Sequence, residues 1–303
     1  KFSVNLHRGC FGGCAFCTIS AHQGKFIASR SKQSILNEVK KITEMPDFKG
    51  YISDLGGPSA NMYRMRGKDS ALCEKCKKPS CIFPEICFNL NTDHSALLEI
   101  YHAVNNVAGV KKAFISSGIR YDMLLHKSNN EQTDRATKNY IEELITRHVS
   151  GRLKVAPEHT SDNVLQIMRK PSFDQFIQFK KIFDSINQKH HLNQQLIPYF
   201  ISSHPGCTLL DMAELAATIK NLKLKPEQVQ DFTPSPMTLA TEIYYTGYHP
   251  YTLEPIYTAR TKKEKNAQHR FFFWHQPSNK PVIISELKRI QRPDMIKKIY
   301  PKG

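Results

Sequence analysis

The chain has 303 residues, of which 40% are hydrophobic and 23% are charged, so it can bury either one barrel-sized core or two ordinary ones. It contains no run of about 18 apolar residues, which excludes a membrane-spanning helix, and its first residues lack the apolar segment of a signal peptide. The 43 Lys and Arg residues exceed the 27 Asp and Glu residues, and the resulting charge of +16 favours an anionic partner.

In chain order, short apolar runs predict six strands, and the segments between them carry apolar residues three and four positions apart, as helices do. The predicted strands are residues 2–6, 50–55, 112–117, 152–156, 195–201 and 229–233. Thr208 and Asp211 have the spacing of a helix capping box. Alternating strands and helices predict an α/β fold with a parallel sheet. Six units are too few for a closed eight-unit barrel, so we expect an open (β/α)6 partial TIM barrel, with a flat doubly wound sheet as the alternative.

Two segments interrupt this alternation. Residues 58–92 form a cysteine-rich insertion after the second strand, and residues 237–303 form a basic and aromatic extension after the sixth. We therefore expect a barrel over residues 1–236 and a C-terminal extension that packs on it or closes it. The first residue is Lys rather than Met, so we also expect the chain to be part of a longer protein.

Eight cysteines without a secretory signal favour a reducing compartment, here the cytoplasm, and metal chemistry over disulfides. Cys10, Cys14 and Cys17 have the spacing C-x3-C-x2-C directly after the first strand. Three thiolates on one loop can bind three corners of a 4Fe–4S cluster and leave one iron open, as a catalytic cluster requires. The alternatives are zinc with His7 or His22 as the fourth ligand, and disulfides, which cannot pair three cysteines evenly.

A second set of cysteines lies within the insertion, at Cys73, Cys76, Cys81 and Cys87. Four thiols in so short a segment, with few residues able to build a core around them, predict a metal site. Zinc suits the compact set, and an auxiliary iron–sulfur cluster is the alternative. The remaining cysteine, Cys207, is expected to be buried or to line a pocket.

The C-terminal extension combines charge with aromatic residues. Residues 262–303 contain eleven Lys or Arg residues and three acidic ones, interrupted by the run Phe-Phe-Phe-Trp at 271–274 and preceded by Tyr244, Tyr245, Tyr248 and Tyr251. Basic residues with stacking aromatics suit an RNA substrate. The alternative is that the aromatic residues pack at the edge of the barrel while the charges are solvated.

The cysteine spacing, with Phe16 before the last cysteine, resembles the signature of radical S-adenosylmethionine (SAM) enzymes. The second strand ends in DLGGP (residues 54–58), which looks like the Gly-Gly element of that superfamily. The segments SSGIRYD, LKVAPEHTSDNVLQIMRKP, FISSHPGCT and DFTPSP fall at later strand ends. Together they resemble the YgiQ family of radical SAM proteins, which has no assigned reaction.

The resemblance implies that the open iron binds SAM and that one-electron reduction, from a donor such as flavodoxin or ferredoxin, yields a 5′-deoxyadenosyl radical. It also implies a set of SAM contacts. Gly56 and Gly57 would approach the methionyl ammonium group. Related enzymes often carry Glu where this chain has Pro58, so Ser117 or Glu158 would provide the polar partner instead. Arg169 would face the SAM carboxylate, and the Phe16 backbone would contact the adenine. Charge at a helix start explains Glu158 equally well, and a solvated helix-end cation explains Arg169.

Three hypotheses on function follow. The first is a radical SAM enzyme acting on an unidentified substrate, with no catalytic residue assigned. The second is an RNA-modifying enzyme of the same class. The third is a metal-stabilised interaction module whose metal sites are structural.

Overall fold

The computed structural model describes residues 1–301, so the last two residues of the predicted extension, Lys302 and Gly303, lie outside it. The described chain divides into two compact units. The first unit comprises residues 1–13, 19–155 and 174–196, and the second comprises residues 14–18, 156–173 and 197–303. No helix within residues 1–301 combines the length and the apolar character needed to cross a membrane.

Parallel strand pairs form the centre of the first unit. β1 (Ser3–Asn5) pairs with β5 (Asp54–Gly56), and β4 (Tyr51–Ile52) pairs with β6 (Lys112–Ala113). Val4 lies opposite Leu55, and both side chains are almost fully buried. A short antiparallel pair, β2 (His7–Arg8) and β3 (Ala28–Ser29), follows β1. The apolar runs therefore form strands because their side chains reach a common core.

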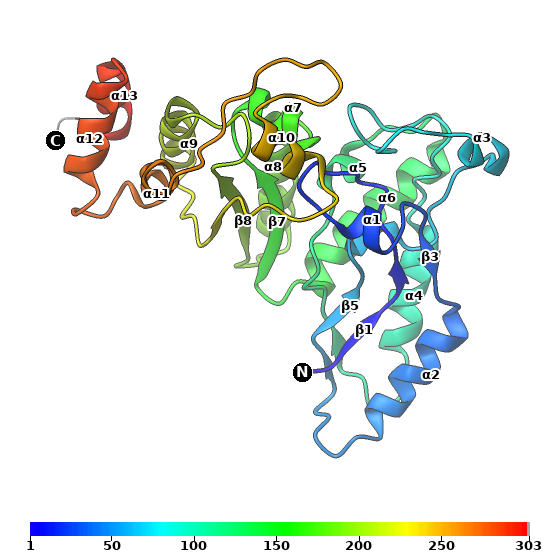
Figure 1. The fold of residues 1–303 in the computed structure, drawn as a ribbon. Helices are drawn as coiled ribbons and strands as arrows, with labels where there is room; N and C mark the ends of the chain where they lie inside the picture. Colours follow the sequence, from blue (N-terminus) through cyan, green and yellow to red (C-terminus); the bar gives the residue numbers. More distant parts are fainter. Residues whose placement is uncertain (302–303) are drawn as a thin grey trace. The chain divides into compact units, whose positions relative to one another are not determined.

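Helices cover these strands. The helical segments whose residues lie in the first unit are α1 (Ile19–His22), α2 (Lys32–Thr43), η1 (Ala60–Met62), α3 (Ser70–Glu74), α4 (Ser95–Asn105), α5 (Tyr121–Leu125), α6 (Glu131–Glu143), the π-helical η2 (Leu144–His148) and, except for its first residue, α8 (Phe173–Lys189). α2 packs on β1 and α4, and α4 packs on β6 (Figure 1). Ser31 caps α2 by accepting from the Ser34 amide. Ile35 and Val39, four positions apart, bury the inner face of α2.

The second unit contains the ends of two long strands and one complete strand. β7 (Arg152–Glu158), β8 (Gln195–Ser202) and β9 (Gln228–Asp231) form a sheet in that order, and β8 runs parallel to β9. Its helical segments are α7 (Asp162–Met168), α9 (Leu209–Asn221), α10 (Leu239–Thr246), α11 (Lys262–His269), η3 (Arg270–Phe273), α12 (Lys280–Arg289) and α13 (Pro293–Ile299). α9 packs against α11, η3 and α13, so the extension shares a core with the preceding segments of this unit.

Each of the six predicted strands has a counterpart in the structure, but the third is reduced to the two residues of β6. The second one is split into β4 and β5 at Ser53, whose amide and hydroxyl both donate to the Phe2 carbonyl. The capping box is confirmed: Thr208 caps α9 by accepting from the Asp211 amide, and the Asp211 carboxylate accepts from the Thr208 amide. The parallel pairing confirms an α/β fold.

The aromatic residues of the extension fall into two groups. Phe271 and Phe272 are fully buried, and the Phe272 ring lies 6.4 Å from that of Phe200 on β8. In contrast, Tyr245, Tyr248 and Tyr251 are more than half exposed. The first two residues of the Phe-Phe-Phe-Trp run therefore supply core packing, whereas Phe273 and Trp274 are half-buried and the three tyrosines are open to solvent.

An ion pair joins the end of β9 to the extension. The Asp231 carboxylate lies 2.9 Å from His269 Nδ1 and also accepts from the Ser202 hydroxyl. Hydrogen bonding to Asp231 raises the pKa of His269 above 6.5. Burial opposes ionisation of Asp231, but the hydrogen bonds from His269 and Ser202 outweigh it and lower the pKa of this carboxyl group.

This ion pair predicts a pH-dependent stability. The contribution of His269 is fully present below its unfolded-state pKa of 6.5 and is lost as the pH rises through its higher folded-state pKa. The contribution of Asp231 is present above 3.8 and is lost as the pH falls through its lower folded-state pKa. His269→Gln should therefore lower the melting temperature more at about pH 6 than at about pH 8.5. The matched change at the exposed His275 should show no such difference. Equal losses for His269→Gln at both pH values would contradict the prediction.

Candidate functional site

Cys10 lies just after β2, in the first unit, where the backbone of its loop is tightly held. The Cys10 amide donates to the Gly24 carbonyl at 3.1 Å, and the Gly12 amide donates to Cys10 Sγ at 3.4 Å. Gly9 has φ +86°, and a Cβ there would lie 2.1 Å from the Phe26 carbonyl oxygen. Only glycine fits that position, so the sequence before Cys10 fixes the path of the loop and leaves the thiol partly exposed.

The next part of the loop lies against the cysteine-rich insertion. Gly13 has φ +60°, and a Cβ there would lie 2.3 Å from the Pro79 carbonyl oxygen. The Ser80 hydroxyl donates to the Gly12 carbonyl at 2.7 Å. The insertion therefore takes part in holding the loop, a role that the sequence pattern does not indicate.

Cys14 and Cys17 lie in the second unit on either side of a buried alanine. The Ala15 amide donates to the Met168 carbonyl at 2.9 Å, and the Ala15 carbonyl accepts from the Ala240 amide at the same distance. The Cys17 amide donates to the Cys14 carbonyl at 3.2 Å. Ala15 is 2% exposed, whereas both cysteines are partly exposed. The backbone therefore anchors the loop and leaves the two thiols accessible.

The donors of this loop are of the kind that an iron–sulfur cluster uses. In a 4Fe–4S cluster each thiolate binds a different iron. Cys10, Cys14 and Cys17 supply three soft ligands, and the Gly12 amide shows how backbone donors reach a sulfur. The donor set therefore fits three corners of a cluster.

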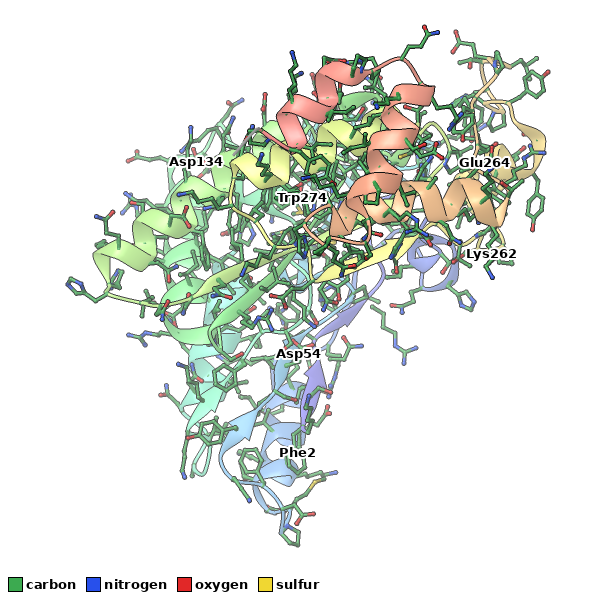
Figure 2. All side chains as sticks on the ribbon, turned by 90° about the vertical axis from the view of Figure 1, so that its left-hand side faces the viewer. Phe2, Asp54, Asp134, Lys262, Glu264 and Trp274 are labelled. Carbon is green, nitrogen blue, oxygen red and sulfur yellow. The ribbon has the colours of Figure 1, made fainter. Side chains whose placement is uncertain are left out.

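Gly56 and Ser117 lie together at the ends of neighbouring strands of the first unit. A Cβ on Gly56 would lie 2.7 Å from Ser117 Oγ. The Asp54 carboxylate, labelled in Figure 2, accepts from the Ser116 amide at 2.8 Å, from the Ser117 amide at 3.0 Å and from the Ser117 hydroxyl. Because the Ser117 hydroxyl donates to Asp54, its oxygen keeps lone pairs available to accept a hydrogen bond.

Gly57 packs on a buried histidine that sequence reasoning considered only as a zinc ligand. A Cβ on Gly57 would lie 2.5 Å from His7 Cε1. His7 is 1% exposed, and neither of its ring nitrogens has a hydrogen-bond partner within residues 1–301. Burial lowers the pKa of His7 to about 4, so the ring is neutral at physiological pH and offers one donor and one acceptor. The signal for His7 in the sequence is a polar residue directly after the first predicted strand. The structure then places this residue beside the Gly56–Gly57 pair.

Glu158 ends β7 with φ +69°, an uncommon conformation for a residue with a side chain. It is 7% exposed, and its Oε1 lies 3.5 Å from Nζ of Lys170, which is 5% exposed. Lys170 follows Arg169, the αL C-cap of α7, whose side chain is only half-buried. The glutamate therefore belongs to a strand end and not to a helix start, and Lys170 is a charged partner that the sequence pattern did not reveal.

Phe16 contacts a second buried histidine, in the second unit. Its ring lies 5.8 Å from that of His204 in an edge-to-face arrangement. His204 is fully buried, and its Nδ1 lies 2.9 Å from the Pro205 carbonyl oxygen. A carbonyl only accepts, so Nδ1 carries the proton and Nε2, which has no partner within residues 1–301, is an acceptor. Burial lowers the pKa of His204 to about 3, which keeps this ring neutral.

Cys207 is fully buried, as predicted, and lies beside a third buried histidine. His159 Nδ1 accepts from the Ser161 amide at 3.0 Å, so the proton of the neutral ring is on Nε2. That nitrogen lies 3.5 Å from Cys207 Sγ. Burial lowers the pKa of His159 to about 4 and raises that of Cys207, so both groups are neutral. An uncharged pair of this kind supplies packing and hydrogen bonding, not an activated thiolate.

Two family models match the chain. The model described as the radical SAM superfamily matches residues 4–216, and a model described as a domain of unknown function (DUF3362) matches residues 227–298. The first match contains the cysteine loop and all of the predicted strands except the last. The second begins just before β9 and covers most of the extension.

Curated relatives match along almost the entire chain. A UPF0313 protein of Bacteroides thetaiotaomicron is 67% identical, with 100% of this chain and 49% of that protein covered. A UPF0313 protein of Porphyromonas gingivalis is 63% identical, with 99% and 47% covered. A UPF0313 protein of Methanocella arvoryzae is 45% identical, with 98% and 48% covered. The chain thus spans about half the length of these relatives.

Among solved structures, the chain is similar to TsrM, a radical S-adenosylmethionine methyltransferase from Kitasatospora setae with cobalamin and a 4Fe–4S cluster bound. The two are 11% identical, with a TM-score of 0.46, and the match covers 80% of this chain and 36% of TsrM. The family model is the stronger finding, since it covers well over half of the chain. Because that match includes the cysteine loop and the parallel strands that follow it, this chain belongs to the radical SAM superfamily.

Proposed function

We propose that this chain is the SAM-cleaving part of a larger radical SAM enzyme, with Cys10, Cys14 and Cys17 as the protein ligands of its 4Fe–4S cluster. When bound, the cluster supplies the electron that cleaves SAM into methionine and a 5′-deoxyadenosyl radical, which takes a hydrogen atom from the substrate. The observation that carries the proposal is the backbone of the cysteine loop, which is fixed by glycine packing and hydrogen bonds while the thiols remain accessible.

We also propose that the strands form an open (β/α)6 partial barrel. Three observations support this arrangement: β1 and β5 pair in parallel, β4 and β6 pair in parallel, and Ile119 forms a parallel bridge with Val155. The parallel pair β8 and β9 continues the same order. Parallel strands joined in chain order bring their carboxyl ends to one edge, where ligands of α/β folds bind.

Within the first unit, the SAM methionyl group is assigned to the surface formed by Gly56, Gly57 and Ser117. At Gly56 and Gly57 the space of a side chain is taken by Ser117 Oγ and the His7 ring, so the methionyl ammonium group is proposed to approach the backbone beside Ser117. Ser117 Oγ, which donates to Asp54, can accept from that ammonium group. In this proposal Asp54 replaces the acidic residue that is missing at position 58. It acts on the ammonium group through the Ser117 hydroxyl and does not contact that group directly. His7, neutral and behind Gly57, supports this surface.

The second unit supplies the remaining candidates. Arg169 is proposed to face the SAM carboxylate, because its side chain is half-buried and has no ion-pair partner within residues 1–301. Glu158, neutralised in part by Lys170, is the second candidate for the ammonium group. Phe16 is proposed to contact the adenine through its backbone, with His204 holding its ring. An external flavodoxin or ferredoxin is the proposed electron donor. The partly exposed thiols suit a reducing compartment such as the cytoplasm.

RNA is a second candidate substrate, because exposed tyrosines lie close in sequence to basic residues. Tyr245, Tyr248 and Tyr251 are 69%, 52% and 75% exposed, and Lys265 Nζ lies 4.9 Å from the neighbouring Tyr244 ring. Aromatic faces beside cations suit unstacked bases. If this surface binds RNA, changing the three exposed tyrosines to Ala should weaken binding of an RNA hairpin about tenfold or more, and binding should fall as salt rises. Unchanged binding in a gel-shift titration would remove the RNA hypothesis.

The first prediction from the main proposal concerns SAM cleavage. The anaerobically reconstituted and reduced chain should release 5′-deoxyadenosine from SAM. Changing Cys10, Cys14 and Cys17 together to Ala should abolish that release and remove about four irons per chain, because the cluster loses all of its protein ligands. Chromatography of the nucleoside and iron analysis measure both outcomes, and circular dichroism controls for folding. Release that persists in this variant would refute the assignment.

A second prediction separates packing from ligand contact at Gly57. Gly57→Val should weaken SAM binding, but the added side chain also clashes with the His7 ring. His7→Ala opens that space, so the double variant relieves the clash while it still fills the surface facing the ligand. Relative to His7→Ala alone, the double variant should bind SAM about tenfold more weakly, which corresponds to about 1.4 kcal/mol. Isothermal titration with iron content as the control measures this, and equal affinities would show that Gly57 only makes room for His7.

A further inference from the structure

The four cysteines of the insertion line one cavity of the first unit. Its volume is about 260 Å³, and Cys73, Cys76, Cys81 and Cys87 all contribute to its wall. The rest of the wall is mainly apolar, with Phe11, Ile27, Met65 and Leu90 among its residues. Hydrophobic packing alone does not explain why thiols from four positions of an irregular segment line one cavity. The buried cluster beside it also contains Phe11 and Met123, which belong to other segments of the chain.

Local structure explains how the thiols reach this cavity. Asp69 caps the short helix α3 by accepting from the Ala71 and Leu72 amides, and α3 carries Cys73 (Figure 1). The Cys76 amide then donates to the Cys73 carbonyl at 3.1 Å. On the other side of the segment, the Cys87 amide donates to the Cys81 carbonyl at 2.8 Å. A tight turn at Cys73–Cys76 and a longer loop closed between Cys81 and Cys87 therefore present the cysteines in two pairs, and none of the four is in a disulfide.

The arrangement of the thiols distinguishes one ion from a cluster. Zinc would need all four sulfurs at about 2.3 Å from one point. Within the part of the chain that the structure describes, no three such ligands converge in that way. A cuboidal cluster requires the opposite, since each thiolate binds its own iron and the four sulfurs surround a larger volume. We propose that Cys73, Cys76, Cys81 and Cys87 bind a second 4Fe–4S cluster in this cavity.

The surroundings of the cavity suit thiolate ligands. The Asn89 side-chain amide donates to Cys73 Sγ at 3.3 Å, and Lys25 Nζ lies 3.9 Å from Cys76 Sγ. Asn89 is held in this orientation because it also exchanges hydrogen bonds with the backbone of Asp69. Donors and a cation directed at sulfur stabilise its negative charge. Gly67 leaves space for Cys73, since a Cβ there would lie 2.2 Å from Cys73 Sγ.

The second site is joined to the loop that carries the first. The Cys81 amide donates to the Phe11 carbonyl at 3.0 Å, and Phe11 is the residue after Cys10. Cys10, Cys81 and Cys87 also pack against the same buried cluster, which consists of Phe11, Met62, Met65, Ile82, Leu90 and Met123. A covalent and hydrogen-bonded path therefore leads from Cys81 to Cys10 inside the first unit. On the proposed function, Cys73, Cys76, Cys81 and Cys87 would hold a cluster that would supply one-electron transfer between the external donor and the cluster bound by Cys10, with no bond made or broken.

Iron analysis tests the second site independently of the first. The unaltered 303-residue chain should carry about eight irons, and the chain with Cys10, Cys14 and Cys17 changed to Ala should keep about four, with an EPR signal on reduction. Adding Cys73→Ala and Cys76→Ala to that background should remove these four irons, whereas adding Cys207→Ala should not. One zinc per chain, or four titratable thiols without metal in the folded protein, would overturn the proposal. The variant without Cys10, Cys14 and Cys17 is expected not to cleave SAM, so its iron content tests the second site alone. A negative result for that iron content is therefore distinct from failure of the proposed function.

A glycine variant provides a second test that keeps all of the ligands. Gly67→Ala places a methyl group on Cys73 Sγ, so iron in the otherwise unaltered chain should fall from about eight to about four per chain. Gly118 is the matched control, since a Cβ there has no atom within 4 Å. Gly118→Ala should retain the full iron content. Retention of eight irons in Gly67→Ala would show that Cys73 is not a ligand.

Discussion

The constraint on which the candidate site depends is the close backbone packing of the loop that carries Cys10, Cys14 and Cys17. Gly9 and Gly13 both have positive φ, and each lies too close to a carbonyl oxygen to accept a side chain. Ala15 uses both of its backbone groups in hydrogen bonds. Within each unit these contacts hold the backbone of the loop, so folding contributes to ordering the residues that carry the proposed ligands.

Polar groups at the strand ends are held by neighbours that set their hydrogen-bonding roles. Asp54 accepts three hydrogen bonds from residues 116 and 117, which makes Ser117 Oγ an acceptor for a further partner. Lys170 offsets the charge of Glu158 in a buried position. His7 and His204 are kept neutral by burial and retain ring nitrogens without partners in the part of the chain that the structure describes. Because an unpaired buried polar atom costs about 1–3 kcal/mol, such groups are typical of sites that bind a ligand.

The sequence predicts the ordered parts of this protein well, because local patterns determine them. Apolar runs located all six strands, and the spacing from Thr208 to Asp211 located the start of α9. The cysteine spacing and the Gly-Gly pair identified the superfamily. Long-range partners were not predictable in this way. Nothing local to Asp54 indicates that it accepts a hydrogen bond from Ser117. In the same way, no local pattern indicates that Phe271 is buried whereas Tyr245 is exposed.

The insertion shows why a metal site and a fold element can depend on each other. Its segment around Cys73 and Cys76 is almost entirely exposed, so apolar burial contributes little to its order. Its contacts with the loop of Cys10 include the Ser80 hydroxyl, which donates to the Gly12 carbonyl, and the Cys81 amide, which donates to the Phe11 carbonyl. A cofactor that ordered this segment would therefore also stiffen the loop of Cys10, since the same backbone bonds link the two. On the proposed assignment, metal binding in the insertion would in this way be coupled to the position of Cys10 through Ser80 and Cys81.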